Sequence, residues 1–238
     1  MTPKIFIAAA VLAIGGGAAY WQLSGPSAGQ MAQQTTALTA LATPVISTQD
    51  SSQSSEDSAE KPAATITEMT MGPADAKVTI MEYASFTCPH CASFHKTVLK
   101  PLKADYIDTG KIQFIYRDVY FDRPGLWGAM LARCGGSERF FGIADMLYTQ
   151  QREWLGADDA LGISNNLRRI GKVAGLGEDQ INACLQDADK AEALMAWFQT
   201  NIETDEVSGT PTLIINGEKH SNMSYADLKK IIDEKLAE

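Results

Sequence analysis

A Cys-x-x-Cys motif at residues 88–91 lies between a segment with strand character and a segment with helix character. Residues 77–83 before it are rich in β-branched and aromatic side chains, which predicts a buried strand. After the motif, apolar side chains recur at intervals of three and four residues and define one face of a helix: Cys91, Phe94, Val98, Leu102 and Tyr106. The two cysteines are therefore expected at a strand-to-helix turn, which indicates an α/β fold.

A thiol at the start of a helix is expected to be acidic. The free N–H groups and the positive end of the helix dipole stabilise an anion, and the anion that attacks a disulfide is a thiolate. We therefore expect Cys88 to be the exposed nucleophile and Cys91 to be the resolving thiol. Pro89 suits the first helical turn, where a missing N–H costs nothing. His90 can supply a donor or partial positive charge beside the Cys88 sulfur, or it can be a simple solvated histidine.

A Cys-x-x-Cys motif alone fits a zinc site or a structural pair as well as a redox centre. His95 extends the motif toward a zinc-ligand set, but structural zinc needs a fourth ligand nearby. A second feature far downstream favours the redox interpretation. Residues 209–212, Gly-Thr-Pro-Thr, lead into an apolar strand, and Asn-Gly at 216–217 predicts a hairpin turn after it.

This downstream loop resembles the loop of thioredoxin-fold proteins in which a cis-proline packs against Cys-x-x-Cys. Together with Cys-Pro-His-Cys, it makes residues 64–236 similar to the DsbA-type thiol:disulfide oxidoreductases. The resemblance implies a thioredoxin-like fold with an inserted all-helical domain, and catalysis without a cofactor. It also implies that a substrate backbone lies along Thr210 and Pro211. The partners would be reduced exported proteins and a membrane thiol oxidase of the DsbB kind.

The amino-terminal residues predict export. Residues 1–23 have the layout of a secretory signal, with Lys4, an apolar run and then small residues. The apolar character continues for about the length that spans a bilayer, so a retained membrane anchor fits as well. Both interpretations place the rest of the chain in the periplasm, where disulfides persist. Residues 24–63, rich in Ser, Thr, Gln and Ala, are expected to form a disordered linker.

The rest of the chain is expected to form a thioredoxin-like domain interrupted by helices. Strands are predicted at 64–69 and 111–116 besides the one before the motif. Pro101 is expected to kink or end the regular part of the active-site helix, and Ser224 is expected to cap the last helix. The expected parts are the first half of the domain (64–121), a helical insertion without a strand (122–204), and the second half with the proline loop (205–238).

Cys134 and Cys184 both fall in the helical segment. In an oxidising compartment a structural disulfide between two helices is favoured, and its loop of about fifty residues would add roughly 3–4 kcal/mol. Two unpaired buried thiols are the alternative. A third interpretation is a regulatory disulfide that tunes Cys88, which resembles what some DsbA relatives carry.

Glu82 is the one acid in the strand before the motif. Alternation with Val78 and Ile80 turns Glu82 toward the interior, which predicts a buried carboxylate that accepts or returns the Cys91 proton. The resemblance supports this role, because DsbA-like and thioredoxin-like proteins keep an acid there. The alternative is that Glu82 faces solvent.

Charge and the residue before the proline limit the function. A formal net charge of −9 argues against nucleic-acid binding. Threonine at 210 occurs in isomerase- and reductase-type relatives, whereas many oxidases carry an aliphatic residue there. Cys-Pro-His-Cys, with no separate dimerisation domain, favours a monomeric oxidase that introduces disulfides into exported proteins. A periplasmic reductase or isomerase and a non-enzymatic chaperone are the alternatives.

Overall fold

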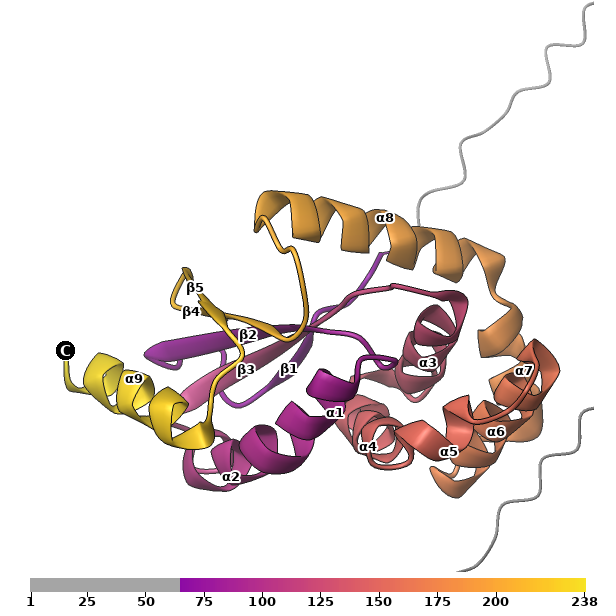
Figure 1. The fold of residues 1–238 in the computed structure, drawn as a ribbon, viewed down its shortest axis with the longest axis horizontal. Helices are drawn as coiled ribbons and strands as arrows, with labels where there is room; N and C mark the ends of the chain where they lie inside the picture. The colour runs from indigo at the N-terminus through magenta and orange to yellow at the C-terminus, as the bar shows by residue number, and fades with distance from the viewer. Residues whose placement is uncertain (1–64) are drawn as a thin grey trace, which may run out of the picture. The chain divides into compact units, whose positions relative to one another are not determined.

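The computed structural model describes residues 65–238, which contain one five-stranded mixed sheet (Figure 1). Its order is β1-β3-β2-β4-β5, with β2 at the centre. β2 runs parallel to β3 and antiparallel to β4. The strands are β1 (Met69–Met71), β2 (Val78–Ala84), β3 (Ile112–Asp118), β4 (Thr212–Ile215) and β5 (Glu218–Ser221). The predicted secretory signal and linker lie outside the described residues.

The central strands form as their side-chain patterns require. In β3, buried Ile112, Phe114 and Tyr116 alternate with partly exposed side chains, which is the period of a strand with one covered face. In β2 the last residues, Glu82, Tyr83 and Ala84, are all buried. The end of β2 that leads into the cysteine motif is therefore covered on both faces.

The predicted first strand at 64–69 is wrong in position. The strand is β1, Met69–Met71, which pairs with Phe114–Tyr116. The residues just before it bind other elements instead of extending the sheet. A turn follows β1 at Gly72, where φ is 83° and an added Cβ would lie 2.2 Å from the Ile112 carbonyl oxygen.

The helix after the motif runs without a break from Pro89 to Ile107. It consists of α1 (Pro89–Phe94), the π-helical turn η1 (His95–Leu99), α2 (Lys100–Leu102) and the π-helical turn η2 (Lys103–Ile107). Pro101 has no N–H to donate, and the wide turns on both sides take up the interruption, with the Lys100 N–H donating to the His95 carbonyl. Pro101 therefore disturbs the regular hydrogen bonding, as predicted, but does not end the helix.

The segment between β3 and β4, residues 119–211, contains helices and no strand. Its helices pack on one another and on the sheet. This confirms the thioredoxin-like fold with a helical insertion. The helices are α3 (Arg123–Cys134), α4 (Gly136–Thr149), α5 (Gln151–Leu155), α6 (Ala160–Val173), α7 (Glu178–Gln186) and α8 (Ala188–Thr204).

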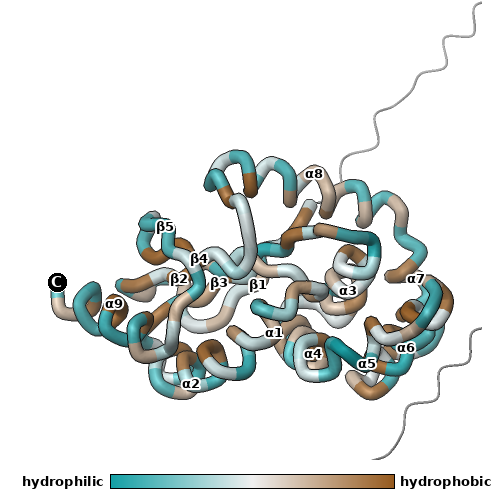
Figure 2. The backbone as a smooth tube through the Cα atoms, viewed as in Figure 1, coloured by the Kyte–Doolittle hydropathy of each residue, from teal (hydrophilic) through white to brown (hydrophobic). Residues whose placement is uncertain are grey.

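Helices cover both faces of the sheet. α1, α2 and α9 (Tyr225–Ala237) lie on one side, and α8 lies on the other (Figure 1). Ser224 caps α9 by accepting from the Asp227 N–H. Hydrophilic and hydrophobic residues alternate along α9 (Figure 2), and its buried Leu228 and Ile232 belong to the hydrophobic core. None of the helices within residues 65–238 combines the length and the apolar character needed to cross a bilayer.

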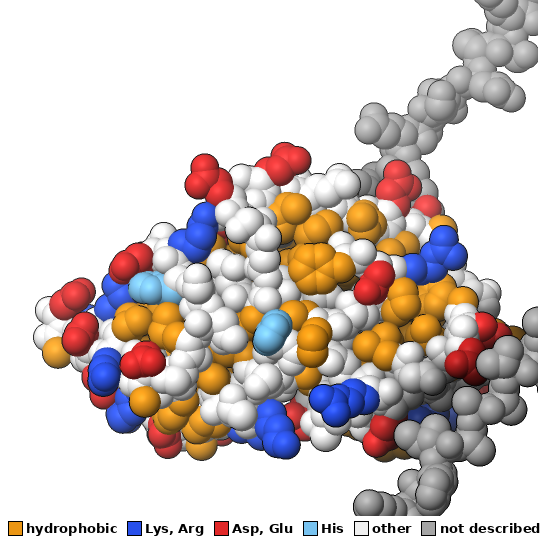
Figure 3. Space-filling model, in the orientation of Figure 1, with side chains coloured by type: hydrophobic (Ala, Val, Ile, Leu, Met, Phe, Trp, Pro, Cys, Tyr) orange, Lys and Arg blue, Asp and Glu red, His pale blue; other side chains and the backbone are white. Residues whose placement is uncertain are grey.

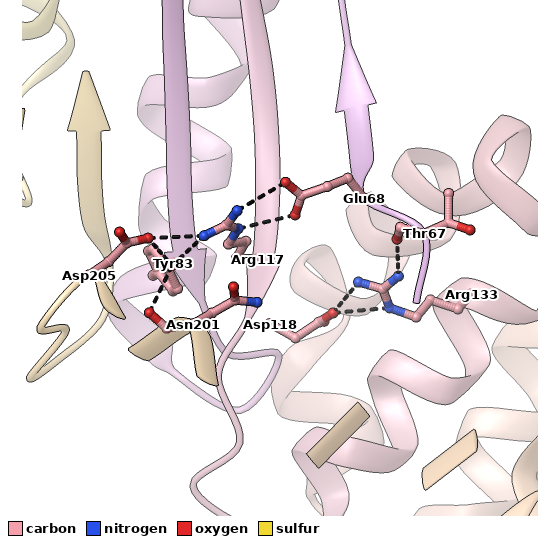
Figure 4. A network of polar contacts seen from close by, with 8 residues as sticks. All are labelled: Thr67, Glu68, Tyr83, Arg117, Asp118, Arg133, Asn201 and Asp205. Atoms are coloured by element: carbon pink, nitrogen blue, oxygen red, sulfur yellow. Dashed lines mark hydrogen bonds and ion pairs between the residues drawn. The ribbon is translucent and has the colours of Figure 1, made fainter. Parts of the chain in front are cut away.

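A polar network ties the start of the described chain to the sheet and to the end of α8 (Figure 4). The Arg117 guanidinium of β3 donates to both Glu68 carboxylate oxygens at 3.1 Å. The same guanidinium donates to Asp205 at 2.9 Å and to the Tyr83 hydroxyl at 2.8 Å. Tyr83 in turn donates to Asp205. Because Asp205 follows α8, this network holds the chain that leads into the proline loop against the sheet.

A second ion pair joins the sheet to the insertion (Figure 4). Arg133 of α3 donates to Asp118, at the end of β3, at 2.6 and 3.0 Å. Both side chains are almost completely buried. Arg133 also donates to the Thr67 carbonyl at 2.8 Å, which explains why the chain there does not pair with β3.

Candidate active site

Cys88 caps the active-site helix. Its backbone is extended, and its sulfur accepts from the Cys91 N–H at 3.4 Å. Pro89 occupies the first helical position, as the sequence predicts. Cys88 is 8% exposed and Cys91 is fully buried, so Cys88 is the accessible member of the pair. The expected exposure of Cys88 was nevertheless too high, because the proline loop lies over the sulfur.

The pKa of Cys88 is lowered to about 5. The largest cause is a hydrogen bond from the Cys91 thiol; burial acts in the opposite direction, and the Thr210 side chain and the backbone N–H groups of Cys91 and His90 add to the lowering. The helix-start amides therefore contribute as the sequence argument expects. The neighbouring thiol contributes more, and that argument did not include it.

Cys91 has the opposite environment. Burial raises its pKa far above the ordinary value for a thiol, and the hydrogen bond to Cys88 and the negative charge of Glu82 act in the same direction. In the reduced pair, one negative charge is thus concentrated on Cys88 while Cys91 keeps its proton. This is the division between nucleophile and resolving thiol that dithiol–disulfide exchange needs.

His90 lies on the surface of the first helical turn, with an exposed side chain. Its backbone N–H is the group that helps to lower the Cys88 pKa. The sequence left two interpretations of the imidazole, a donor or partial charge beside the Cys88 sulfur and a solvated side chain. In the structure the side chain is exposed, and the His90 group that acts on Cys88 is the backbone amide.

The proline loop comes from the far end of the chain and meets Cys88. The Thr210–Pro211 peptide bond is cis, and the Cys88 thiol donates to the Thr210 carbonyl at 3.6 Å. The Thr210 hydroxyl lowers the pKa of both cysteines, although it meets no partner with regular hydrogen-bond geometry among residues 65–238. The structure therefore brings Thr210 and Pro211 to the cysteine pair.

Glu82 lies inside the protein, as strand alternation predicts, and is fully buried. Its Oε2 lies 3.1 Å from His95 Nε2, and its Oε1 has no hydrogen-bond partner in the described part of the chain. His95 was considered in the sequence only as a zinc ligand. Its position one helical turn after Cys91 is the signal that could have placed it beside Glu82. Within residues 65–238, no three His, Cys, Asp or Glu side chains gather as metal ligands.

Gln151 is a site residue that the sequence did not reveal. It begins α5, is buried, and its Nε2 donates to the carbonyls of Phe86 and Cys88, each at 2.9 Å. A lone glutamine in a helical segment belongs to no motif, so only the fold could identify it. It connects the helical insertion directly to the active-site turn.

Cys134 and Cys184 form a disulfide with a Cα–Cα distance of 5.8 Å. It joins the end of α3 to α7, so it crosslinks two helices of the insertion.

Most of the described chain is similar to known proteins. The profile of the family described as Thioredoxin matches residues 64–234. A putative protein-disulfide oxidoreductase of Rickettsia bellii is 32% identical over 176 residues, which cover 72% of this chain and 65% of that protein. A probable disulfide bond formation protein D of Bacillus cereus is 28% identical over 180 residues, covering 71% and 79%. The chain spans between 61% and 65% of the length of the Rickettsia relatives.

Solved structures show the same architecture. Wolbachia pipientis alpha-DsbA1 superposes with a TM-score of 0.66 at 26% identity, over 74% of this chain and 94% of that chain. BdbD from Bacillus subtilis superposes with a TM-score of 0.64 at 19% identity, over 72% and 94%, which shows the shared fold alone.

Proposed function

This chain belongs to the DsbA-type proteins of the thioredoxin family, and on that basis we propose that it is a thiol:disulfide oxidoreductase acting through Cys88 and Cys91. The observation that carries the proposal is the asymmetry of the pair. The pKa of Cys88 is lowered to about 5, that of Cys91 is raised, and the Thr210 carbonyl lies 3.6 Å from the Cys88 sulfur.

The proposed direction is oxidation of substrate proteins. A stabilised Cys88 thiolate lowers the free energy of the reduced pair, and a pair that is stable when reduced has a disulfide that readily accepts electrons. The substrates would be reduced proteins in the periplasm. A membrane thiol oxidase of the DsbB kind would restore the disulfide, and the protein would act as a monomer.

The proposed reaction has two exchanges. A substrate thiolate attacks Cys88 Sγ, the Cys88–Cys91 bond breaks, and the electron pair goes to Cys91 Sγ. A second substrate thiolate then attacks the substrate sulfur of the mixed disulfide. The oxidised substrate leaves and the reduced pair remains, so the two cysteine sulfurs carry both electrons.

The substrate backbone would lie along Thr210 and Pro211, beside the accessible sulfur. The face drawn in Figure 3 carries apolar side chains between charged groups that lie mostly at its rim. Phe121, in the loop after β3, is among the exposed large apolar side chains. Such a surface suits unfolded chains better than one folded partner, because apolar contacts do not depend on one sequence.

One observation favours a reductase or isomerase instead. The Thr210 hydroxyl acts on both cysteines, and it also lowers the pKa of Cys91, the thiol that must stay protonated. A hydroxyl that lowers the pKa of both thiols reduces the asymmetry that makes the pair oxidising.

The test is equilibration of the full chain with mixtures of reduced and oxidised glutathione, followed by trapping and mass spectrometry of the thiols. An oxidase should give a reduction potential well above that of thioredoxin, toward about −120 mV, whereas a value near −270 mV would identify a reductase. Cys88→Ser is the control and should show no exchange. If wild-type protein and Cys88→Ser oxidise a reduced test protein equally slowly, the proposal fails.

A further inference from the structure

The proposed exchange requires a proton to enter and leave a closed part of the protein. Cys91 is fully buried, and its sulfur must lose a proton whenever it attacks and regain one whenever it is released. Cys88 needs no such route, because its pKa of about 5 keeps it ionised at neutral pH. The route by which the Cys91 proton reaches solvent is therefore independent of how Cys88 is ionised.

The inner end of a path is Glu82. Its carboxylate is fully buried and close enough to Cys91 for its charge to raise the pKa of that thiol. One carboxylate oxygen is bound to His95, and the other has no hydrogen-bond partner among the described residues. When Cys88 is in a mixed disulfide it is no longer a thiolate that accepts a hydrogen bond from Cys91. The negative charge of Glu82 still acts on the buried Cys91 thiol in that state.

The middle of the path is His95, whose Nε2 lies 3.1 Å from Glu82 Oε2. Its ring packs against the ring of Tyr148, with centroids 3.9 Å apart, and edge-on against Tyr116 and Phe94. The Tyr116 and Tyr148 hydroxyls bind each other at 2.7 Å. These aromatic contacts hold the imidazole in one orientation, with Nε2 toward Glu82.

The outer end is the surface. His95 is 4% exposed, and this small part of it lines two hollows. One hollow, of about 490 Å³, lies where α1 and η1 meet α4 and α5, and Lys96 and Gln150 form part of its wall. The other, of about 340 Å³, is bounded by Met71, Leu99 and Phe141 among others. Glu82 lines neither hollow, so His95 separates the buried carboxylate from solvent.

We propose that His95 relays the Cys91 proton between Glu82 and the two hollows that it lines. The inference rests on the proposed exchange at Cys88 and Cys91 and adds a proton-transfer residue to it. An imidazole suits this position because each ring nitrogen can hold or release a proton near neutral pH.

The step balances as follows for oxidation by oxidised glutathione. The Cys88 thiolate attacks a glutathione sulfur, which forms a mixed disulfide and releases one glutathione thiolate. Cys91 then passes its proton to Glu82, which passes one to His95, which releases one to solvent. The Cys91 thiolate attacks Cys88 Sγ, the bond to glutathione breaks, and the second glutathione thiolate leaves with that electron pair.

One experiment can separate the formation of the Cys88–glutathione adduct from its decay by attack of Cys91. Reduced full-length protein is mixed rapidly with oxidised glutathione, quenched in acid at increasing times and weighed by mass spectrometry. His95→Ala should form the Cys88–glutathione adduct at the wild-type rate, because that step needs only Cys88. The adduct should then decay about 10²-fold more slowly, which is the lower end of what general acid–base catalysis contributes.

Added imidazole distinguishes a proton relay from a packing role. Because His95 lines an open hollow, free imidazole can replace the missing ring in His95→Ala, and adduct decay should accelerate with imidazole concentration. Glu82→Gln should also accumulate the adduct but should not respond to imidazole, since position 82 is closed to solvent. Lys96→Ala, in the wall of the same hollow, is the matched control and should match wild type at both steps.

His95→Gln keeps most of the side-chain volume and serves if His95→Ala does not fold. Decay of the adduct at the wild-type rate in either variant would overturn the relay, and so would slow decay in His95→Ala that imidazole does not change. A wild-type protein that forms no adduct at all would instead contradict the proposed function, so the two failures are distinguishable.

Discussion

The acidity of Cys88 depends on its neighbours more than on the helix it caps. Its pKa is lowered mainly by the Cys91 thiol, and only then by Thr210 and the backbone amides. The helix start was visible in the sequence, because residue spacing defines it. The thiol–thiol hydrogen bond depends on how far apart two sulfurs lie, which spacing alone does not determine.

The pH dependence of alkylation should show directly how much Cys91 lowers the pKa of Cys88. Above about pH 5 Cys88 is a thiolate, and the thiolate is lost as the pH falls through that value. The rate of reaction with iodoacetamide should therefore be half-maximal near pH 5. In Cys91→Ala the main stabilising hydrogen bond is missing, so the midpoint should rise toward the ordinary thiol value of about 8.5 without reaching it, because the amides remain.

A wild-type midpoint near 8.5 would contradict the assignment of Cys88 as the nucleophile. Equal midpoints in wild type and Cys91→Ala would show that the amides alone acidify the thiol.

Gln151 should matter to stability because it satisfies two buried carbonyls of the active-site turn. Gln151→Met keeps the shape of the side chain and removes both donors. We expect a loss of about 1–3 kcal/mol in the free energy of unfolding, measured with urea, since the Phe86 and Cys88 carbonyls each lose a buried donor, although the Cys88 carbonyl still accepts from the Ala92 N–H. Gln150→Met, one residue earlier and partly exposed, is the control and should change stability little.

At the scale of elements, the sequence located most strands and helices because each has its own period of apolar residues. β3 and the helix after the motif are clear cases. The misplaced first strand shows the limit: Thr67 and Glu68 have side chains compatible with a strand, but Arg133 and Arg117 bind them from elements distant in sequence. A local pattern cannot include such partners.

The buried pair of Asp118 and Arg133 joins β3 to α3 and should be costly to break. Arg133→Met leaves Asp118 buried without its partner, and we expect equilibrium unfolding to show a loss of about 3–5 kcal/mol. Replacing both residues, as Asp118→Leu with Arg133→Met, should cost clearly less because no lone charge remains. A double variant less stable than the single one would show that the pair itself stabilises the fold.

The disulfide between α3 and α7 should stabilise the insertion. Cys134→Ser with Cys184→Ser opens a loop of 50 residues, and the chain-entropy relation gives a loss of about 3–4 kcal/mol. If the disulfide is structural, the potential of the Cys88–Cys91 pair should stay within a few millivolts of wild type in a glutathione titration. A large shift in that potential would identify it as regulatory.

At the scale of the molecule, the helical insertion does more than cover the sheet. Phe86, just before the cysteine motif, stacks on Tyr116 and also contacts Phe140 and Tyr148 of α4. Gly128 of α3 approaches Phe86 so closely that an added Cβ would lie 3.2 Å from the phenylalanine. With Gln151, these contacts make the insertion one wall of the active-site turn. Sequence spacing predicted that helices interrupt the domain, but not which of their residues reach the cysteines.

The sheet order has a consequence for how the protein is made. β2, the central strand, has β3 on one side and β4 on the other, and β4 comes from the last part of the chain. Cys88 and Thr210 are 122 residues apart. A chain synthesised from its amino end therefore carries a reactive sulfur long before the residues that shield it emerge. Until then, one edge of β2 is open, and the nascent chain carries the Cys88 and Cys91 thiols without the loop that later covers them.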